Sequence, residues 1–154
     1  MDLTAKPAER LELQVGVLLA IDPRSESTMS EKPTILIADD EPGVVAALAR
    51  EARRAGLSYI TDTTSQQVLE LAVRHQPAVI ILDLKQHVDG RDLLAALKRD
   101  PRTRNIKVLV LSAIEDQFTR HVCLELGADD YDVKPFDPSF MSKVARLAGA
   151  GERH

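Results

Sequence analysis

From residue 34 onward, short apolar runs alternate with longer segments whose apolar residues recur at helical spacing. The apolar runs lie at residues 34–38, 78–82, 106–111 and 131–133, and a weaker strand-like run lies at 58–61. The helical patterns that follow them lie at residues 42–56, 65–75, 89–101, 116–126 and 138–147. A continuous apolar run is typical of a strand buried on both faces, so the alternation predicts five β–α units.

Proline and glycine mark the ends of these predicted helices. Pro42 suits a first helical position, and Gly56 and Gly127 suit the residue that follows a last turn. Gln76 and Pro77 end the second helix. We therefore expect an α/β fold, a doubly wound, flavodoxin-like parallel sheet with strand order 2-1-3-4-5 and helices on both faces.

Residues 1–33 differ from the rest of the chain. Three prolines and a polar stretch at 24–32 interrupt them, although residues 8–21 could form a helix with an apolar face. They are predicted to be an extension or linker, and an alternative start at Met29 stays open. The compact domain is then expected at 34–148, with residues 149–154 as a tail.

Composition narrows the function classes. The 154 residues carry a net charge of −4 and no basic stripe, which argues against direct nucleic-acid binding. No apolar run reaches the roughly 18 residues that a membrane span needs. Cys123 is the only cysteine, which suits a reducing compartment and a buried structural thiol. We expect a cytoplasmic protein that does not bind membranes.

Chemically active side chains follow four of the apolar runs. Asp39 and Asp40 come after TILIA, Asp83 after AVIIL, Ser112 after VLVL, and Lys134 after YDV. The carboxyl ends of parallel strands meet at one edge of a sheet, where α/β proteins build their sites. Three carboxylates, a hydroxyl and an ammonium at one edge predict divalent-metal and phosphoryl-transfer chemistry.

The acidic residues fit a Mg²⁺ site. Asp39 and Asp40 repel each other unless a cation lies between them, and Mg²⁺ needs only two or three carboxylates beside its waters. A solvated turn, or a helix cap at Asp40, is the alternative. Asp83 follows a central strand, where an unpaired carboxylate is costly, and it is a candidate nucleophile for an aspartyl-phosphate.

Lys134 and Ser112 complete the set. A lysine ammonium suits one phosphoryl or carboxylate oxygen, and the Ser112 hydroxyl could donate to a phosphoryl oxygen. Each also has a plainer interpretation, as a surface lysine and as a strand-end serine bonded to its own backbone. The ordered series is more specific than its members.

The region from Pro33 to about Ala148 resembles the receiver domain of two-component response regulators. The segments that carry the resemblance are ILIADDEPGV, VIILDL, DGRDLLAALK, VLVLSA and GADDYDVKPF. The resemblance implies that Asp83 accepts the phosphoryl group. It further implies that Asp40 and Asp83 bind Mg²⁺ directly, that Asp39 acts partly through water, and that Lys85 lends a backbone carbonyl.

The same resemblance assigns the residues that respond to phosphorylation. It implies that Ser112 moves toward the phosphoryl group, that Lys134 pairs with it, and that a cis bond precedes Pro135. Tyr131 is similar to the aromatic residue that turns inward in this family. The surface of 116–147 would then change and select a partner, with a homodimer through the last two helices as one outcome.

The loop after Asp83 departs from the family pattern. Gln86 and His87 stand where receivers commonly have Met-Pro, and Gly90 comes one residue early. The loop is therefore one residue shorter, which bears on the Lys85 carbonyl and on the lifetime of the phosphorylated state. His87 is interpreted as a solvated loop residue.

We expect a phosphorylation-controlled signalling switch that takes its phosphoryl group from a histidine kinase or phosphotransfer protein. It would be no enzyme beyond its own phosphorylation and dephosphorylation, and it looks like a stand-alone receiver or one cut from a longer protein. The alternative is a pseudo-receiver, a phosphorylation-independent interaction module. A phosphatase of the haloacid dehalogenase type is disfavoured, because the first strand is followed by DDEPG rather than D-x-D-x-T.

Overall fold

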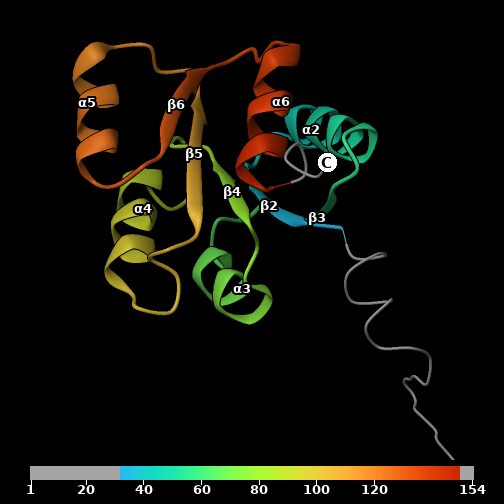
Figure 1. Ribbon diagram of the computed structural model, residues 1–154. Coiled ribbons are helices and arrows are strands. Elements are labelled where there is room, and N and C mark those ends of the chain that lie inside the picture. Colours follow the sequence, from blue (N-terminus) through green and yellow to red (C-terminus); the bar gives the residue numbers. More distant parts are fainter. Residues whose placement is uncertain (1–31, 150–154) are drawn as a thin grey trace, which may run out of the picture. The chain divides into compact units, whose positions relative to one another are not determined.

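The computed structural model describes residues 32–149, and these form a parallel sheet with helices on both sides (Figure 1). The sheet has five strands in the order β3-β2-β4-β5-β6, which confirms the predicted doubly wound topology. In chain order the elements are β2 (Thr34–Ala38), α2 (Pro42–Arg54), β3 (Ser58–Asp62), α3 (Val68–His75), β4 (Val79–Leu82), α4 (Gly90–Arg99), β5 (Lys107–Ser112), α5 (Gln117–Glu125), β6 (Asp130–Val133) and α6 (Pro138–Leu147). The extension predicted at 1–33 and the tail at 149–154 fall almost wholly outside the described residues.

Alternate residues of each central strand face opposite sides of the sheet and supply two cores. On β2, Leu36 and Ala38 join the core under α3, α4 and α5, whereas Ile35 and Ile37 join the core under α2 and α6. All four are fully buried. This is why the central strands are apolar throughout, as expected for a parallel sheet covered on both faces.

The buried thiol expected at Cys123 lies in the first of these cores, on α5. Burial raises the pKa of this thiol, with smaller contributions from nearby charges. A thiol that is buried and protonated reacts poorly, which agrees with a structural role.

The second helix begins later than the sequence pattern predicts. It was expected from Ser65, but α3 begins at Val68, because the Asp62 carboxylate accepts hydrogen bonds from the backbone N–H groups of Thr64 and Gln67, each at 2.8 Å. Ser65 lies in this turn with a left-handed φ of 61°. Local hydrogen bonds of this kind compete with helix formation.

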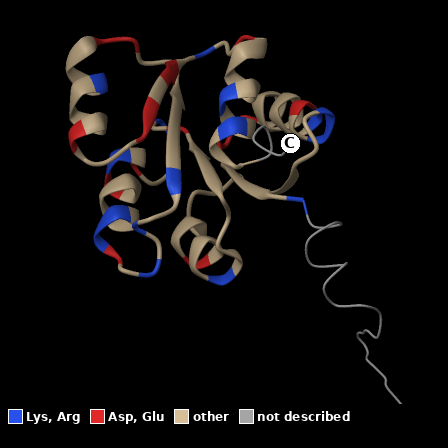
Figure 2. Ribbon diagram, viewed as in Figure 1, with Lys and Arg blue, Asp and Glu red and all other residues tan. Residues whose placement is uncertain are grey.

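Charged residues are interspersed over the helices rather than gathered in a basic stripe (Figure 2). One grouping joins α6 to β6, where Lys143 Nζ lies 2.6 Å from Asp130 and 2.7 Å from Asp132. Within residues 32–149, no helix is long and apolar enough to cross a membrane.

Candidate functional site at the carboxyl edge of the sheet

The strand register brings the predicted residues to one edge. Ala38 pairs with Leu82, so the residues that follow them, Asp39 and Asp83, leave the sheet side by side. The backbone N–H of Asp83 donates to the carbonyl of Ala38 at 3.0 Å. The two carboxylates therefore meet because parallel pairing continues to the last residue of each strand.

The same register places the hydroxyl and the ammonium on the other side of Asp83. Ser112 is the last residue of β5 and pairs with Val133, the last residue of β6. Lys134 follows directly, and its backbone N–H donates to the Ser112 carbonyl at 2.8 Å. The Lys134–Pro135 peptide is cis, as the family resemblance implies.

The Lys134 side chain reaches into a group of carboxylates. Its Nζ lies 2.8 Å from Asp39, 2.6 Å from Glu41 and 3.4 Å from Asp83. Asp39 and Asp83 are almost completely buried, whereas Glu41 is exposed. One cation therefore balances two buried anions and one exposed anion.

The electrostatics of the site favour a second cation. Burial raises the pKa of Asp83 to about 6, the charge of Asp39 adds to the increase, and Lys134 and the backbone N–H of Lys85 only partly offset it. Burial alone would lower the pKa of Lys134, but its bonds to Asp39 and Glu41 raise it above the usual range. The lysine is thus firmly charged while Asp83 still lacks full compensation.

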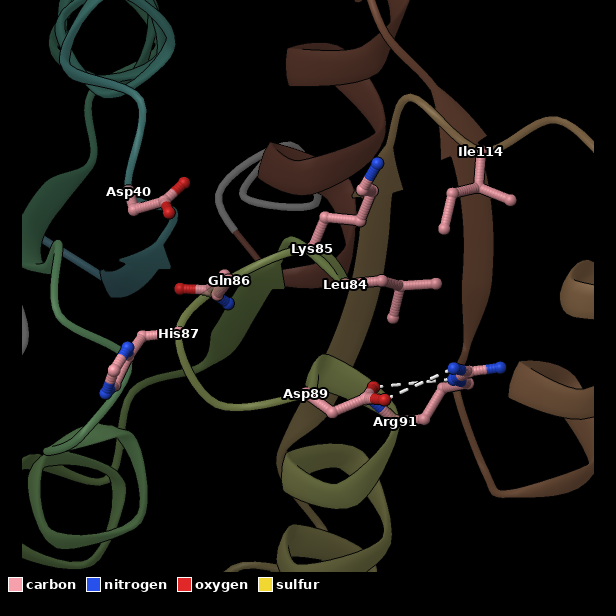
Figure 3. Close-up of a pocket in the computed structure, with 8 residues that line it drawn as sticks. All are labelled: Asp40, Leu84, Lys85, Gln86, His87, Asp89, Arg91 and Ile114. Carbon is pink, nitrogen blue, oxygen red and sulfur yellow. Dashed lines mark hydrogen bonds and ion pairs between the residues drawn. The ribbon is translucent and has the colours of Figure 1, made fainter.

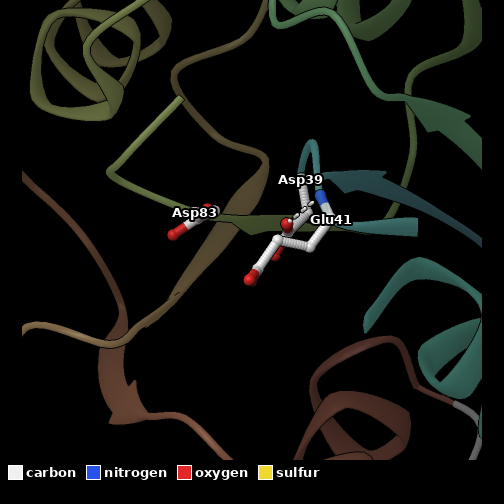
Figure 4. Close-up of side chains that lie close together, drawn as sticks. All are labelled: Asp39, Glu41 and Asp83. Atoms are coloured by element: carbon white, nitrogen blue, oxygen red, sulfur yellow. Dashed lines mark hydrogen bonds between the residues drawn. The ribbon is translucent and has the colours of Figure 1, made fainter. Parts of the chain in front are cut away.

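The donor set fits a hard divalent cation. Carboxylate oxygens of Asp39, Glu41 and Asp83 lie within 4.8 Å of one another (Figure 4). Oxygen ligands from two or three carboxylates are what Mg²⁺ needs when it keeps several waters. Sequence analysis did not single out Glu41. Its signal was its place directly after the acidic pair and before Pro42, from which its backbone N–H donates to Asp39 at 2.9 Å.

Asp40 is not a member of that triple, and Lys85 takes part through its backbone N–H to Asp83. Asp40 is exposed and lines a pocket with Lys85, Gln86 and other residues of the β4–α4 loop (Figure 3). The assignments of Asp40 as a direct ligand, of Asp39 as an indirect one and of the Lys85 carbonyl as a third stay predictions.

Ser112 and Tyr131 are buried, and both hydrogen-bond to the backbone of Ile114. The Ser112 hydroxyl accepts a hydrogen bond from the backbone N–H of Ile114 at 3.2 Å. The Tyr131 hydroxyl donates to the Ile114 carbonyl at 2.6 Å, and the residue as a whole is only 3% exposed. The predicted switch aromatic thus lies inward, and both residues hold the turn that leaves β5.

Comparisons with known proteins agree with this geometry. The model of the response regulator receiver domain matches residues 35–146. The chain is 34% identical over 124 residues to the phosphate regulon transcriptional regulatory protein PhoB of Pseudomonas aeruginosa, covering 77% of this chain and 54% of that protein. It is also 34% identical over 105 residues to the alkaline phosphatase synthesis transcriptional regulatory protein PhoP of Bacillus subtilis, covering 68% of this chain and 43% of that protein. It thus spans about half the length of these relatives.

Solved structures give the same result. The receiver domain of the Francisella response regulator 1452 superposes with a TM-score of 0.70 at 25% identity, over 78% of this chain and 99% of that one. A CheY-like receiver domain protein from Methanospirillum hungatei shares the fold, with a TM-score of 0.71 at 19% identity over 79% of this chain and 98% of that one. The family match covers most of the chain, so the chain belongs to the response regulator receiver domains of two-component systems.

Proposed function

We propose that this receiver domain is a phosphorylation-controlled switch whose phosphoacceptor is Asp83. The observation that carries the proposal is the near-complete burial of the Asp83 carboxylate, with Lys134 3.4 Å away and the Asp39 carboxylate beside it. In this position the Lys134 ammonium can pair with an incoming phosphoryl group at Asp83. The carboxylates of Asp39, Glu41 and Asp83 can in addition bind a divalent cation.

The reaction is transfer of a phosphoryl group from a phosphohistidine of a histidine kinase or phosphotransfer protein. An oxygen of Asp83 attacks phosphorus, the N–P bond of the phosphohistidine breaks, and its electron pair stays on the imidazole nitrogen. Bound Mg²⁺ would offset the charge of the phosphoryl oxygens, held by Asp83 together with Asp39, Asp40 or Glu41. Lys134 would pair with one phosphoryl oxygen, and this new contact would replace part of its present contact with Glu41.

The proposed readout passes through Ser112 to the surface of α5, β6 and α6. Within residues 32–149, the exposed large hydrophobic side chains are Phe118, Leu124 and Val133, all on α5 or β6. We propose that a protein partner binds at these two elements, either a downstream protein or a second copy of the domain. The relatives are named transcriptional regulators, so control of transcription through a further component is the output class to test first.

We place this activity in the cytoplasm, with no other enzymatic reaction and with no direct binding of nucleic acid or membrane by the domain itself. A pseudo-receiver would have no need for a buried acidic site with its lysine, and nothing in the geometry favours it.

The test is the response to beryllofluoride, a mimic of a phosphoryl group on a carboxylate. Adding it with Mg²⁺ should shift the backbone amide resonances around Asp83, Ser112 and Tyr131 in two-dimensional NMR spectra. The Asp83→Asn variant should show no such shifts. Unchanged spectra of the wild-type protein at saturating Mg²⁺ would rule out the switch.

A further inference from the structure

The loop between β4 and α4, residues 85–89, is closed by short backbone contacts at its two ends. The backbone N–H of Gly90 donates to the Leu84 carbonyl at 2.9 Å. A Cβ atom at position 90 would lie 2.5 Å from the Asp83 carbonyl oxygen and 2.5 Å from the Leu84 Cα. The chain thus returns to the backbone of Asp83 and Leu84 within a few residues, and only glycine at position 90 allows this close approach.

Gln86 ties the loop directly to Asp83. Its Nε2 donates to the backbone carbonyl of Asp83 at 2.6 Å, and its backbone N–H donates to the Leu84 carbonyl at 3.2 Å. The nitrogen must face the Asp83 carbonyl, because the amide oxygen would meet it acceptor to acceptor. That oxygen, Oε1, is buried with no donor among residues 32–149, which is an unfavourable position that the Nε2 bond offsets.

Ser65, on the β3–α3 turn, ties the far end of the same loop. Its hydroxyl oxygen accepts a hydrogen bond from the backbone N–H of Val88 at 2.8 Å, and the residue is 1% exposed. The turn that presents it is fixed by Asp62, which is itself buried. Burial would raise the pKa of Asp62, but hydrogen bonds from Thr64 and Gln67 lower it, so the carboxylate stays ionised and holds the turn.

We propose that Gln86 and Ser65 are positioning residues for the Asp83 site. Together they hold loop 85–89 in a fixed shape, and the backbone of this loop at Lys85 would assist a divalent cation bound at Asp83. The inference rests on the proposed function and adds to it the residues that position the backbone beside Asp83. Neither side chain would bind the cation itself; each would lower the entropic cost of ordering the backbone at Lys85 that would bind it.

The test compares Gln86→Met and Ser65→Gly with a control, Gln66→Met. Methionine matches the length of glutamine and removes the donor, and glycine removes the hydroxyl while tolerating the φ of 61° at position 65. Gln66 is an exposed glutamine on the same turn as Ser65, so Gln66→Met repeats the chemical change outside the loop. The readouts are the Mg²⁺ dissociation constant from NMR titration, the hydrogen-exchange rate of the Val88 amide, and the melting temperature in EDTA.

We expect the Mg²⁺ dissociation constant to rise about tenfold in Gln86→Met and in Ser65→Gly, the usual range for residues that orient a metal ligand. The Val88 amide should exchange faster in both, and Gln66→Met should match the wild type. A purely structural role would lower the melting temperature and leave the dissociation constant unchanged.

Two outcomes separate the inference from the function on which it rests. If the wild type binds Mg²⁺ and both variants stay within twofold of it, the positioning role is wrong and the proposed function stands. If the wild type shows neither Mg²⁺ binding nor a beryllofluoride response, both proposals fall.

Discussion

The Nζ atom of Lys134 lies 3.4 Å from Oδ2 of Asp83, and the two side chains are 12% and 4% exposed. They come from the ends of β6 and β4, which are not neighbours in the sheet but flank β5. The lysine thus acts as an internal counterion for buried carboxylates, in the place where the proposed function needs a charge to meet a phosphoryl group.

Removing that counterion should make the fold depend on a metal ion. In Lys134→Met, Asp39 and Asp83 stay buried without the ammonium, so the free energy of unfolding in EDTA should fall by about 3 kcal/mol. Saturating Mg²⁺ should restore much of it, because a cation that binds only the folded state stabilises that state. Urea unfolding with EDTA and with Mg²⁺ measures both effects.

Lys143→Met is the matched control for this experiment. Lys143 also contacts two carboxylates, Asp130 and Asp132, but these are about one-third exposed. Its loss should change the free energy of unfolding by less than about 1 kcal/mol, with no added response to Mg²⁺. An equal Mg²⁺ response in both variants would contradict the assignment of the site.

The raised pKa of Asp83 predicts a pH-dependent penalty on stability. The folded carboxyl, with a pKa of about 6, binds its proton more tightly than the unfolded carboxyl, with a pKa of 3.8. The contribution of this carboxyl to the free energy of unfolding therefore falls as the pH rises from about 4 to 6, and its full penalty persists above that. Asp83→Asn lacks the charge, so it should be more stable than the wild type by about 2 kcal/mol at pH 7.5.

Urea unfolding in EDTA between pH 4.5 and 8 tests this prediction. The advantage of Asp83→Asn should shrink steadily as the pH falls below 6. An advantage that stays the same across the range, or no advantage at pH 7.5, would show that Asp83 is not destabilised by its surroundings.

Gly90→Ala should damage the site and the fold together. Its Cβ would meet the backbone of Asp83 and Leu84, which cannot give way as a flexible side chain could. We expect a loss of about 1–3 kcal/mol in the free energy of unfolding. Gly43→Ala, in the first turn of α2, meets nothing within 4 Å and should be neutral or slightly stabilising. Similar effects of the two substitutions on thermal unfolding would refute the close approach at Gly90.

Tyr131→Phe should report on the buried hydroxyl. The ring stays in the core, but the Ile114 carbonyl loses its donor, so the free energy of unfolding should fall by about 1 kcal/mol. In Tyr59→Phe the lost partner is Arg53 at an exposed position, and almost no change is expected. Chemical denaturation of Tyr131→Phe and Tyr59→Phe measures the two free energies of unfolding. An equal loss in both variants would mean that burial of the Tyr131 hydrogen bond adds no stability.

The sequence was sufficient to predict the fold and the edge at which the site forms. Central parallel strands are apolar throughout, so the polar residues at their ends, Asp39, Asp83 and Ser112, stand out in the sequence. Lys134 follows a shorter edge strand and is found from its place at the end of that run. The resemblance to receiver domains added Tyr131 and the cis bond before Pro135.

The sequence could not predict the roles of side chains whose hydrogen bonds and ion pairs depend on the exact positions of loops in the folded protein. Glu41 carries no signal of its own in the hydrophobic pattern, and its contact with Lys134 depends on how the segments after β2 and β6 meet. Ser65 fits a helical pattern, and only the hydrogen bonds accepted by Asp62 explain why the helix begins at Val68 instead. Gln86 was noticed as a departure from the family pattern, but its bond to the Asp83 carbonyl has no periodic signal.

The most direct test of the central claim is phosphorylation of Asp83 itself. The protein is incubated with acetyl phosphate and Mg²⁺, and its intact mass and peptide map are measured, beside Asp83→Asn and an EDTA control. We predict that the wild type gains the mass of one phosphoryl group, located at Asp83, only when Mg²⁺ is present, and that Asp83→Asn gains none. No gain by the wild type, or the same gain by Asp83→Asn, would contradict the account.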